Sequence, residues 1–185
     1  MRLNKIMVAA FAALAVSATH AETISYKYVE GGVGEIDDGS AVSAGVSIPL
    51  DPHVYVLGSV YGVDFGPVNG TYVEGGLGYH TAINNHASFF ANGQLLYADV
   101  DRDVRLRDHT DLGAIARAGV RFVPVDKLEL EGTLALSSNN LLYNDGLGFN
   151  ASARYYLAPK VSAAVGYAHH TELDGGFLNV RYDLN

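Results

Sequence analysis

Residues 112 to 137 read LGAIARAGVRFVPVDKLELEGTLALS and contain one alternating pattern twice, with a proline between the two copies. An alternation of period two predicts β-strands, and two such strands around a short turn predict a β-hairpin. One face of this hairpin is apolar and carries Leu112, Ala114, Ala116, Ala118, Val120, Phe122, Leu128, Leu130, Leu134 and Leu136. The other face carries Gly113, Ile115, Arg117, Gly119, Arg121, Glu129, Glu131, Thr133 and Ser137.

The charges of the hairpin suggest its register. A turn over residues 124 to 126 places Arg121 opposite Glu129. Glu131 then lies on the same face, between Arg121 and Arg117. Opposite charges in such cross-strand positions attract each other, so the polar face is complementary in charge.

A hairpin of this kind fits two barrels, a soluble one with its apolar face inside and a membrane one with its apolar face against lipid. The polar face consists mostly of small residues with a few opposite charges, whereas a water-facing surface is usually dense in Lys and Glu. The apolar face carries no charge. A lipid-facing surface requires this, because Arg or Lys at the bilayer midplane costs about 2–4 kcal/mol. The pattern favours the membrane barrel, with the soluble barrel as the alternative.

The start of the chain has the layout of a secretory signal peptide. Arg2 and Lys5 precede an apolar run, and small residues follow it up to Ala21. We expect cleavage after Ala21. Residues 1–21 are then the signal peptide, and residues 22–185 are the outer-membrane barrel.

Composition restricts the remaining possibilities. A chain of 185 residues with 21 Gly, 12 Tyr and 17% charged residues is typical of a single β domain rich in turns. Cleavage leaves 10 basic and 20 acidic residues, a charge of about −10, which argues against nucleic acid as a partner. The absence of Cys excludes disulfides, thiolate metal sites and cysteine nucleophiles. No later apolar run approaches the roughly 20 residues of a spanning helix, so membrane insertion requires a closed barrel.

The alternation continues along the mature chain and predicts ten antiparallel strands, an even number as in bacterial outer-membrane barrels. The predicted strands cover residues 24–28, 42–48, 53–61, 73–80, 88–97, 112–122, 128–137, 147–157, 161–167 and 178–184. In the first strand, Tyr26 and Tyr28 are predicted on the lipid side and Lys27 on the inner side. The strand over 53–61 is apolar on both faces, so its orientation stays open. An eight-stranded barrel is the alternative.

The connections between the predicted strands alternate in length. The short ones are PLDPH at 49–53, INNH at 83–86, PVD at 124–126 and APK at 158–160. The long ones cover residues 31–40, 62–70, 98–110, 138–145 and 170–176. Outer-membrane barrels place short turns and both termini in the periplasm and long loops outside. Outward aromatic residues near strand ends are expected to form interfacial girdles. They are Tyr79, Phe89, Phe122, Tyr155 and Tyr182 on the periplasmic side, with Tyr97 and Tyr167 on the outer side.

The signal peptide, the mature opening ISYKYVEGG at 24–32 and the strand plan resemble small proteobacterial outer-membrane β-barrels, in particular the xanthomonad activator-of-immunity barrel family. The chain is more distantly similar to the OmpA and OmpX type barrels and the opacity proteins. The resemblance covers residues 22–185 and implies a barrel that the barrel assembly machinery inserts among outer-membrane lipid and lipopolysaccharide. In such families the last strand often ends in an aromatic residue, whereas this chain ends in Asn185. The family implies no defined chemistry.

Charged residues with inward parity form the first candidate site, the barrel interior. They are Lys27, Glu74, Arg117, Arg121, Glu129, Glu131, Arg154, Arg181 and Asp183. Buried charges must pair, so one interpretation is a salt-bridge network that fills and stiffens the barrel. The other is a narrow aqueous pore lined by both signs, since ten strands enclose slightly more space than the eight that side chains fill.

The connection over residues 98–110 is the second candidate site, an extracellular loop that meets the outside. Its charged residues are Asp99, Asp101, Arg102, Asp103, Arg105, Arg107, Asp108 and His109. Mixed charges of this kind are typical of a solvated loop. Asp99, Asp101 and Asp103 have the alternate spacing of a calcium loop, but the glycine and distal glutamate of an EF-hand are absent.

Catalytic and metal sites have weaker support. His86 and Ser88 have the His-x-Ser spacing of barrel lipases, but both take inward parity and His86 falls at a predicted turn. His169 and His170 are adjacent in a strand, so they point to opposite faces and do not readily chelate one metal. We predict no catalytic residue, cofactor or metal site.

The sequence therefore predicts a non-enzymatic outer-membrane barrel that is porin-like or structural. One alternative is a surface-binding barrel that uses residues 98–110 to hold an extracellular partner. The other is a barrel enzyme that hydrolyses lipid or peptide.

Overall fold

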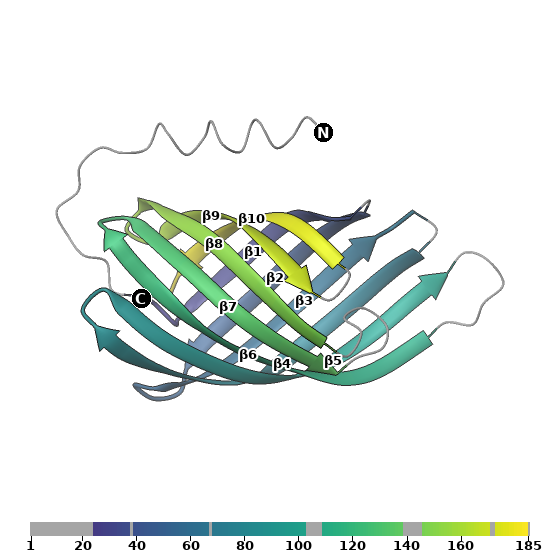
Figure 1. The fold of residues 1–185 in the computed structure, drawn as a ribbon, viewed down its shortest axis with the longest axis horizontal. Helices are drawn as coiled ribbons and strands as arrows, with labels where there is room; N and C mark the ends of the chain where they lie inside the picture. The colour runs from purple at the N-terminus through teal and green to yellow at the C-terminus, as the bar shows by residue number, and fades with distance from the viewer. Residues whose placement is uncertain are drawn as a thin grey trace.

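The computed structural model describes residues 24–37, 39–66, 68–102, 109–138, 146–170 and 173–184, and the predicted signal peptide lies outside them. These residues form a closed barrel of ten antiparallel strands, in which β1 pairs with β10 (Figure 1). The strands are β1 Tyr28–Ile36, β2 Gly39–Pro49, β3 Val54–Asp64, β4 Val68–Asn84, β5 Ala87–Arg102, β6 His109–Val125, β7 Leu128–Ser138, β8 Gly146–Ala158, β9 Val161–His170 and β10 Leu173–Asp183. The prediction of a ten-stranded all-β barrel is confirmed, and the eight-stranded alternative is wrong.

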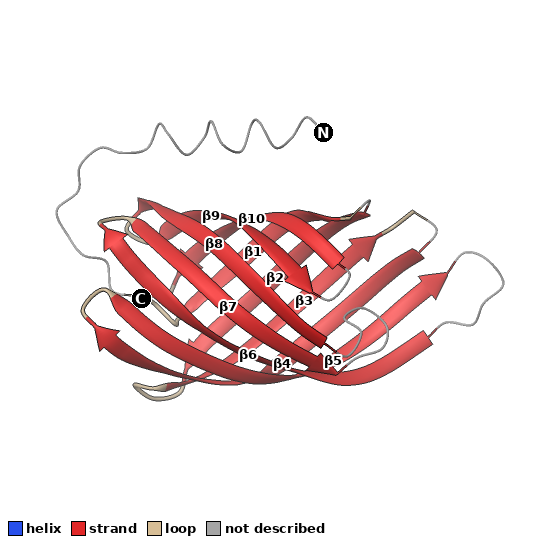
Figure 2. Ribbon diagram, in the orientation of Figure 1, coloured by secondary structure: helices blue, strands red, loops and turns tan. Residues whose placement is uncertain are grey.

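Strands and short connections account for the described part of the chain (Figure 2). None of the described residues belongs to a helix long and apolar enough to cross a membrane. We use "turn end" for the end of the barrel with connections 50–53, 85–86, 126–127 and 159–160, and "loop end" for the opposite end. Since the strand number is even, the first and last described residues both lie at the turn end.

An apolar belt surrounds the outside of the barrel. Every strand contributes at least one exposed large side chain to it, for example Val33, Val42, Val56, Leu77, Leu95, Leu112, Leu134, Leu147, Tyr167 and Leu178. Contiguous apolar surface of this extent marks contact with a membrane or another protein. The soluble alternative, with the apolar face inside, is therefore wrong.

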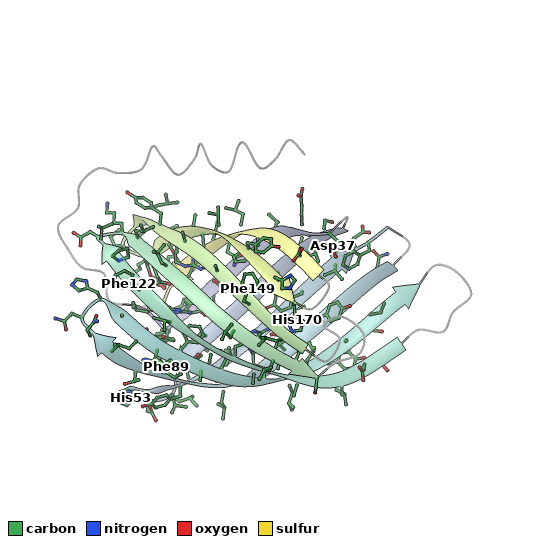
Figure 3. The ribbon with its side chains drawn as sticks, viewed as in Figure 1. Asp37, His53, Phe89, Phe122, Phe149 and His170 are labelled. Atoms are coloured by element: carbon green, nitrogen blue, oxygen red, sulfur yellow. The ribbon has the colours of Figure 1, made fainter. Side chains whose placement is uncertain are left out.

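Aromatic side chains of the belt lie toward both ends of the barrel. Figure 3 shows Phe89 and Phe122 toward the turn end and Phe149 nearer the loop end. All three are exposed on the outer face, as are Tyr79 and Tyr182. Aromatic side chains are favoured at membrane–water interfaces, so these residues fit the predicted girdles.

The connections at the loop end are shorter than predicted. Strands continue into three of the predicted long loops, which leaves only residues 37–38, 65–67 and 171–172 between them. The glycines in these segments suggested loops, but the ladder tolerates glycine, as in β1, where residues 31, 32 and 34 all pair with both neighbouring strands. Only residues 103–108 and 139–145 remain as longer connections at this end.

Three neighbouring strands, β4 to β6, are the longest and extend beyond the others at the loop end (Figure 1). Four residues predicted in the extracellular loop are consequently in strands. β5 includes Asp99, Asp101 and Arg102, and β6 begins at His109. The remaining predicted loop residues, Asp103, Arg105, Arg107 and Asp108, lie outside the described residues.

The register predicted for the β6–β7 hairpin is wrong by two residues along β7. Arg121 pairs with Glu131 rather than Glu129, because the turn consists of residues 126–127 and the ladder shifts between Phe122 and Val125. Pro124 lies in the shifted stretch, and proline has no N–H to donate to a ladder. Between Phe122 and Val125, β6 has two residues, 123 and 124, where β7 has only residue 129. One extra residue on one strand is typical of a β-bulge, and the alternation of the sequence alone does not reveal it.

Lys127 in this turn has a φ of 67°, in the left-handed region that side chains with a Cβ disfavour. We expect Lys127→Gly to stabilise the barrel by about 1 kcal/mol, since glycine adopts this conformation without steric penalty. The measurement is the urea midpoint of unfolding from lipid vesicles. Lys127→Ala is the matched control, because it removes the long side chain but keeps the Cβ. Equal midpoints for the two variants would contradict the backbone explanation.

Candidate functional site

The interior of the barrel contains a connected set of ion pairs near the turn end. We call these six residues, Glu30, Arg121, Glu129, Glu131, Arg154 and Arg181, the charged layer. They project inward from β1, β6, β7, β8 and β10, because inward positions recur at every second residue of each strand. Their pairing therefore crosses the lumen as well as following the sheet.

Two carboxylates of the charged layer make short pairs. The Arg121 Nε lies 2.9 Å from Glu131 Oε2. Glu30 Oε2 lies 3.2 Å from Arg154 Nη2 and 3.4 Å from Arg181 Nε. The Arg121–Glu131 and Arg154–Glu30 contacts are hydrogen bonds between charged groups, which are stronger than neutral ones. The Arg154–Glu30 contact joins β8 to β1, which are not neighbours in the sheet, whereas Glu30 and Arg181 are partners in the β1–β10 ladder.

Glu129 is the centre of the layer. Its Oε1 lies 3.6 Å from Arg181 Nη1 and 3.9 Å from the Nε atoms of both Arg121 and Arg154. The Tyr156 hydroxyl donates a hydrogen bond of 3.3 Å to its other oxygen. Only 1% of the Glu129 side chain is exposed, so three guanidinium groups share one fully buried carboxylate.

Aromatic rings support the cations of the layer. The Arg121 guanidinium lies 4.6 Å from the centroid of the Tyr26 ring and 5.4 Å from that of Phe90. The Arg181 guanidinium lies 3.8 Å from the centroid of the Tyr28 ring. Cation–π contacts of this kind are stronger where water is excluded, and they fix the planes of both guanidiniums.

A second ion pair lies outside the charged layer. Arg117 contacts both oxygens of Glu74, at 2.9 Å through Nη1 and 3.0 Å through Nη2. The two residues come from β6 and β4, on either side of β5. This two-point geometry matches the planar fork of arginine to a carboxylate.

The structure corrects the predicted interior set at the start of the chain. Lys27 is exposed, whereas Tyr26 and Tyr28 are buried inside the barrel. The orientation was inverted because tyrosine fits both a lipid interface and a lumen. Glu30 has the same parity as Tyr28 and is the interior charge that the sequence prediction missed. Glu35, the other acidic residue of β1, has the opposite parity and is exposed, so the acidic residues of this strand do not fix its inner face on their own.

The other predicted interior charges lie inside the barrel. Glu74, Arg117, Arg121, Glu129, Glu131, Arg154 and Arg181 meet in the ion pairs described above. Asp183 is also buried, with 2% of its surface exposed. β3, whose orientation stayed open, buries Tyr55 and directs Val56 outward.

A cavity of about 370 Å³ occupies the lumen on the loop side of the charged layer. Arg121, Glu131, Arg154 and Arg181 line its inner part, and residues of the loop end such as Ile36 and His170 also line it. On the turn side of the layer, the side chains are buried and do not line the cavity. They are Tyr26, Ser47, Ser88, Tyr156, Ser162 and Asp183. The cavity is thus closed toward the turn end.

The cavity and the charged layer together are balanced in charge. Four arginines and three inward-facing glutamates contribute to the cavity lining, and they are Arg117, Arg121, Arg154, Arg181, Glu30, Glu74 and Glu131. Glu129 of the charged layer is a fourth glutamate inside the barrel. The amides of Asn92, Gln94, Asn150 and Asn179 lie between the charged side chains of the lining. Strands that contribute arginines are interspersed around the wall with strands that contribute glutamates, so no single sign of charge dominates the cavity.

The consecutive residues His169 and His170 lie on opposite faces of the barrel wall at the loop end. His169 is exposed and pairs with Asp174 on the outer face, near the Phe149 ring. His170 is buried, and its Nε2 lies 3.0 Å from Ser137 Oγ. Its ring crosses Gly148, where a Cβ would fall 2.9 Å from the His170 Cγ. Glycine at this position therefore allows the contact between β7 and β9.

His86 and Ser88 do not form the pair that a barrel lipase needs. Ser88 Oγ is buried and lies 2.9 Å from the Tyr26 hydroxyl. His86 is exposed in the connection between β4 and β5. No group of three or more His, Asp or Glu side chains suited to a metal ion occurs among the described residues.

Comparison with known proteins identifies the fold and no family. No family model matches this chain, and no curated protein matches it in sequence. The KdgM porin is 10% identical, with a TM-score of 0.52 over 85% of this chain and 99% of the porin. A KdgM porin in complex with disordered oligogalacturonate is 12% identical, with a TM-score of 0.53 over the same shares. The COG4313 outer membrane channel from Pseudomonas putida F1 is 11% identical, with a TM-score of 0.52 over 90% of this chain and 98% of the channel.

At these identities the likeness shows a shared barrel fold. The resemblance to the xanthomonad barrel family stays a prediction.

Proposed function

We propose that this chain is a non-enzymatic, porin-like barrel of a bacterial outer membrane, with a narrow and mostly closed aqueous path. The observation that carries the proposal is the cavity, lined in part by charged side chains and amides, that runs from the loop end to the charged layer. The apolar belt and the barrel fold shared with porins and an outer membrane channel support the location. Outer-membrane barrels place their short turns in the periplasm, so the loop end of this barrel would face outside and the turn end the periplasm.

The charged layer is the constriction of the proposed path. Its guanidiniums and carboxylates are paired, and a passing ion would have to replace one partner of such a pair. Since the cavity and the charged layer together contain four arginines and four inward-facing glutamates, the path should discriminate weakly between small cations and anions. We expect brief, small conductance steps rather than a constantly open pore.

Single-channel recording in planar lipid bilayers tests this proposal. The protein is expressed from its full sequence and purified from membranes, and its folding is checked by heat-modifiable migration on gels. Glu131→Gln should shift ion selectivity toward anions, because it removes a negative charge from the narrowest region. Arg117→Gln should shift selectivity toward cations, so the two substitutions are controls for each other. Shifts of the same sign, or none, would show that ions do not pass these residues.

Absence of conductance steps from the wild type and from every variant, in protein shown to be folded and inserted, would overturn the proposal. The structural role, a plugged barrel that stiffens the envelope, would then replace the porin-like one. Binding of an extracellular partner through residues 98–110 is a separate proposal, tested by deleting residues 103–108 and measuring adhesion.

A further inference from the structure

Residues 24–27 come just before β1 and cross the lumen at the turn end. The Arg121 Nη1 donates a hydrogen bond of 3.1 Å to the backbone oxygen of Ser25. Arg121 belongs to β6, and four strands separate β6 from β1 in either direction around the barrel. A contact between these two positions therefore spans the lumen from one wall to the opposite one.

The Tyr26 side chain fills the lumen on the turn side of the charged layer. Its ring stacks on His80 of β4 at 3.8 Å between centroids, with 7° between the planes. The same ring lies 5.1 Å from that of Tyr55 of β3, and its hydroxyl lies 2.9 Å from Ser88 Oγ of β5. Arg121 of β6 covers the other side of the ring. One side chain thus contacts four consecutive strands of the far wall.

The segment is attached to the barrel by few backbone bonds. The pairing of β1 with β2 and with β10 begins at Tyr28, after the segment. Ser47 Oγ donates a hydrogen bond of 2.7 Å to the Tyr26 oxygen, and the Leu184 N–H donates one of 2.9 Å to the Lys27 oxygen. Residues 24–26 can therefore leave the lumen without breaking any strand pairing of the closed barrel.

We propose that residues 24–27 are a plug that closes the periplasmic end of the aqueous path, and that withdrawal of Tyr26 opens it. The inference rests on the proposed function, because a plug has an effect only in a barrel with a path to close. It adds a second closure, formed by the segment before β1, to the constriction formed by the ion pairs. In this arrangement Tyr26 also holds Arg121 in place, so plug and charged layer are released together.

Single-channel recording of Tyr26→Ala tests the plug. Removal of the ring abolishes the stacked contact with His80 and the cation–π contact with Arg121, so the open fraction should rise by about tenfold or more. Tyr26→Phe is the matched control, because it keeps the ring and loses only the hydroxyl. It should remain close to wild type. His80→Ala, which alters the partner and leaves the plug intact, should give a smaller rise.

The chain contains no cysteine, which permits a chemical rescue of the same contact. Tyr26→Cys should conduct like Tyr26→Ala and should close again when a benzyl thiosulfonate reagent restores a ring at this position. Conduction with equal open fractions in wild type, Tyr26→Ala and Tyr26→Cys would overturn the plug and leave the porin-like function standing. Silence of every folded and inserted variant would instead overturn the porin-like function.

Discussion

Glu129→Gln is expected to lower the free energy of unfolding by about 3–5 kcal/mol, the typical effect of removing one partner from a buried ion pair. The Glu129 oxygen lies within 3.6–3.9 Å of three guanidiniums in a site that water does not reach. Glutamine keeps the shape of the side chain and removes its charge. Arg121, Arg154 and Arg181 would then share only two carboxylates, and their mutual repulsion would be uncompensated. Urea titration of the folded fraction in lipid vesicles measures the loss.

Glu35→Gln is the matched control for this prediction. Glu35 is an exposed residue of β1, so the same chemical change should alter stability by no more than about 0.5 kcal/mol. Equal and small losses for both variants would contradict a dry charged layer, because water would then be neutralising the guanidiniums. Such a result would favour a wide aqueous pore through the layer.

The strand number and the face of most residues could be predicted from the sequence, because a strand alternates with a period of two. Leu134 and Thr133 illustrate this, since one is exposed on the outer face and the other is buried in the lumen. A charge on the lipid side is costly near the bilayer midplane, so a charged residue in the middle of a strand also indicates the inner face. Glu74 and Arg154 follow this rule.

The details of pairing could not be predicted, since they depend on one-residue shifts. The irregular stretch between Phe122 and Val125 moves Arg121 from Glu129 to Glu131, and nothing in the alternation marks it. Contacts across the lumen are also invisible in the sequence. Arg181 meets Glu129 only because the barrel closes, as their strands β10 and β7 are not neighbours in the sheet.

The plug was missed for a chemical reason. Tyrosine has an apolar ring and a polar hydroxyl, so the pattern around Tyr26 fits a membrane interface as well as a lumen. β1 contains two acidic residues, Glu30 and Glu35, which lie on opposite faces, so its acidic residues alone do not fix its phase.

Leu134→Arg is expected to destabilise the barrel by about 2–4 kcal/mol, the effect of a cation on the lipid face near the bilayer midplane. Leu134 lies in the middle of β7, on the outer face, and 59% of its surface is exposed. Its neighbours across the ladder are Ala118 and Phe149, which offer no partner for a charge. Reversible unfolding from lipid vesicles in urea gives the difference.

Depth in the bilayer distinguishes this effect from a simple loss of packing. Leu112, near the loop end of β6, is 77% exposed on the same outer face. Leu112→Arg should cost only about 0–1 kcal/mol, because a charge at the interface stays hydrated. Water would hydrate an exposed arginine equally at both positions in a soluble barrel, and the two substitutions would then have equal, small effects. A large loss at Leu134 together with a small loss at Leu112 therefore requires lipid around the middle of β7.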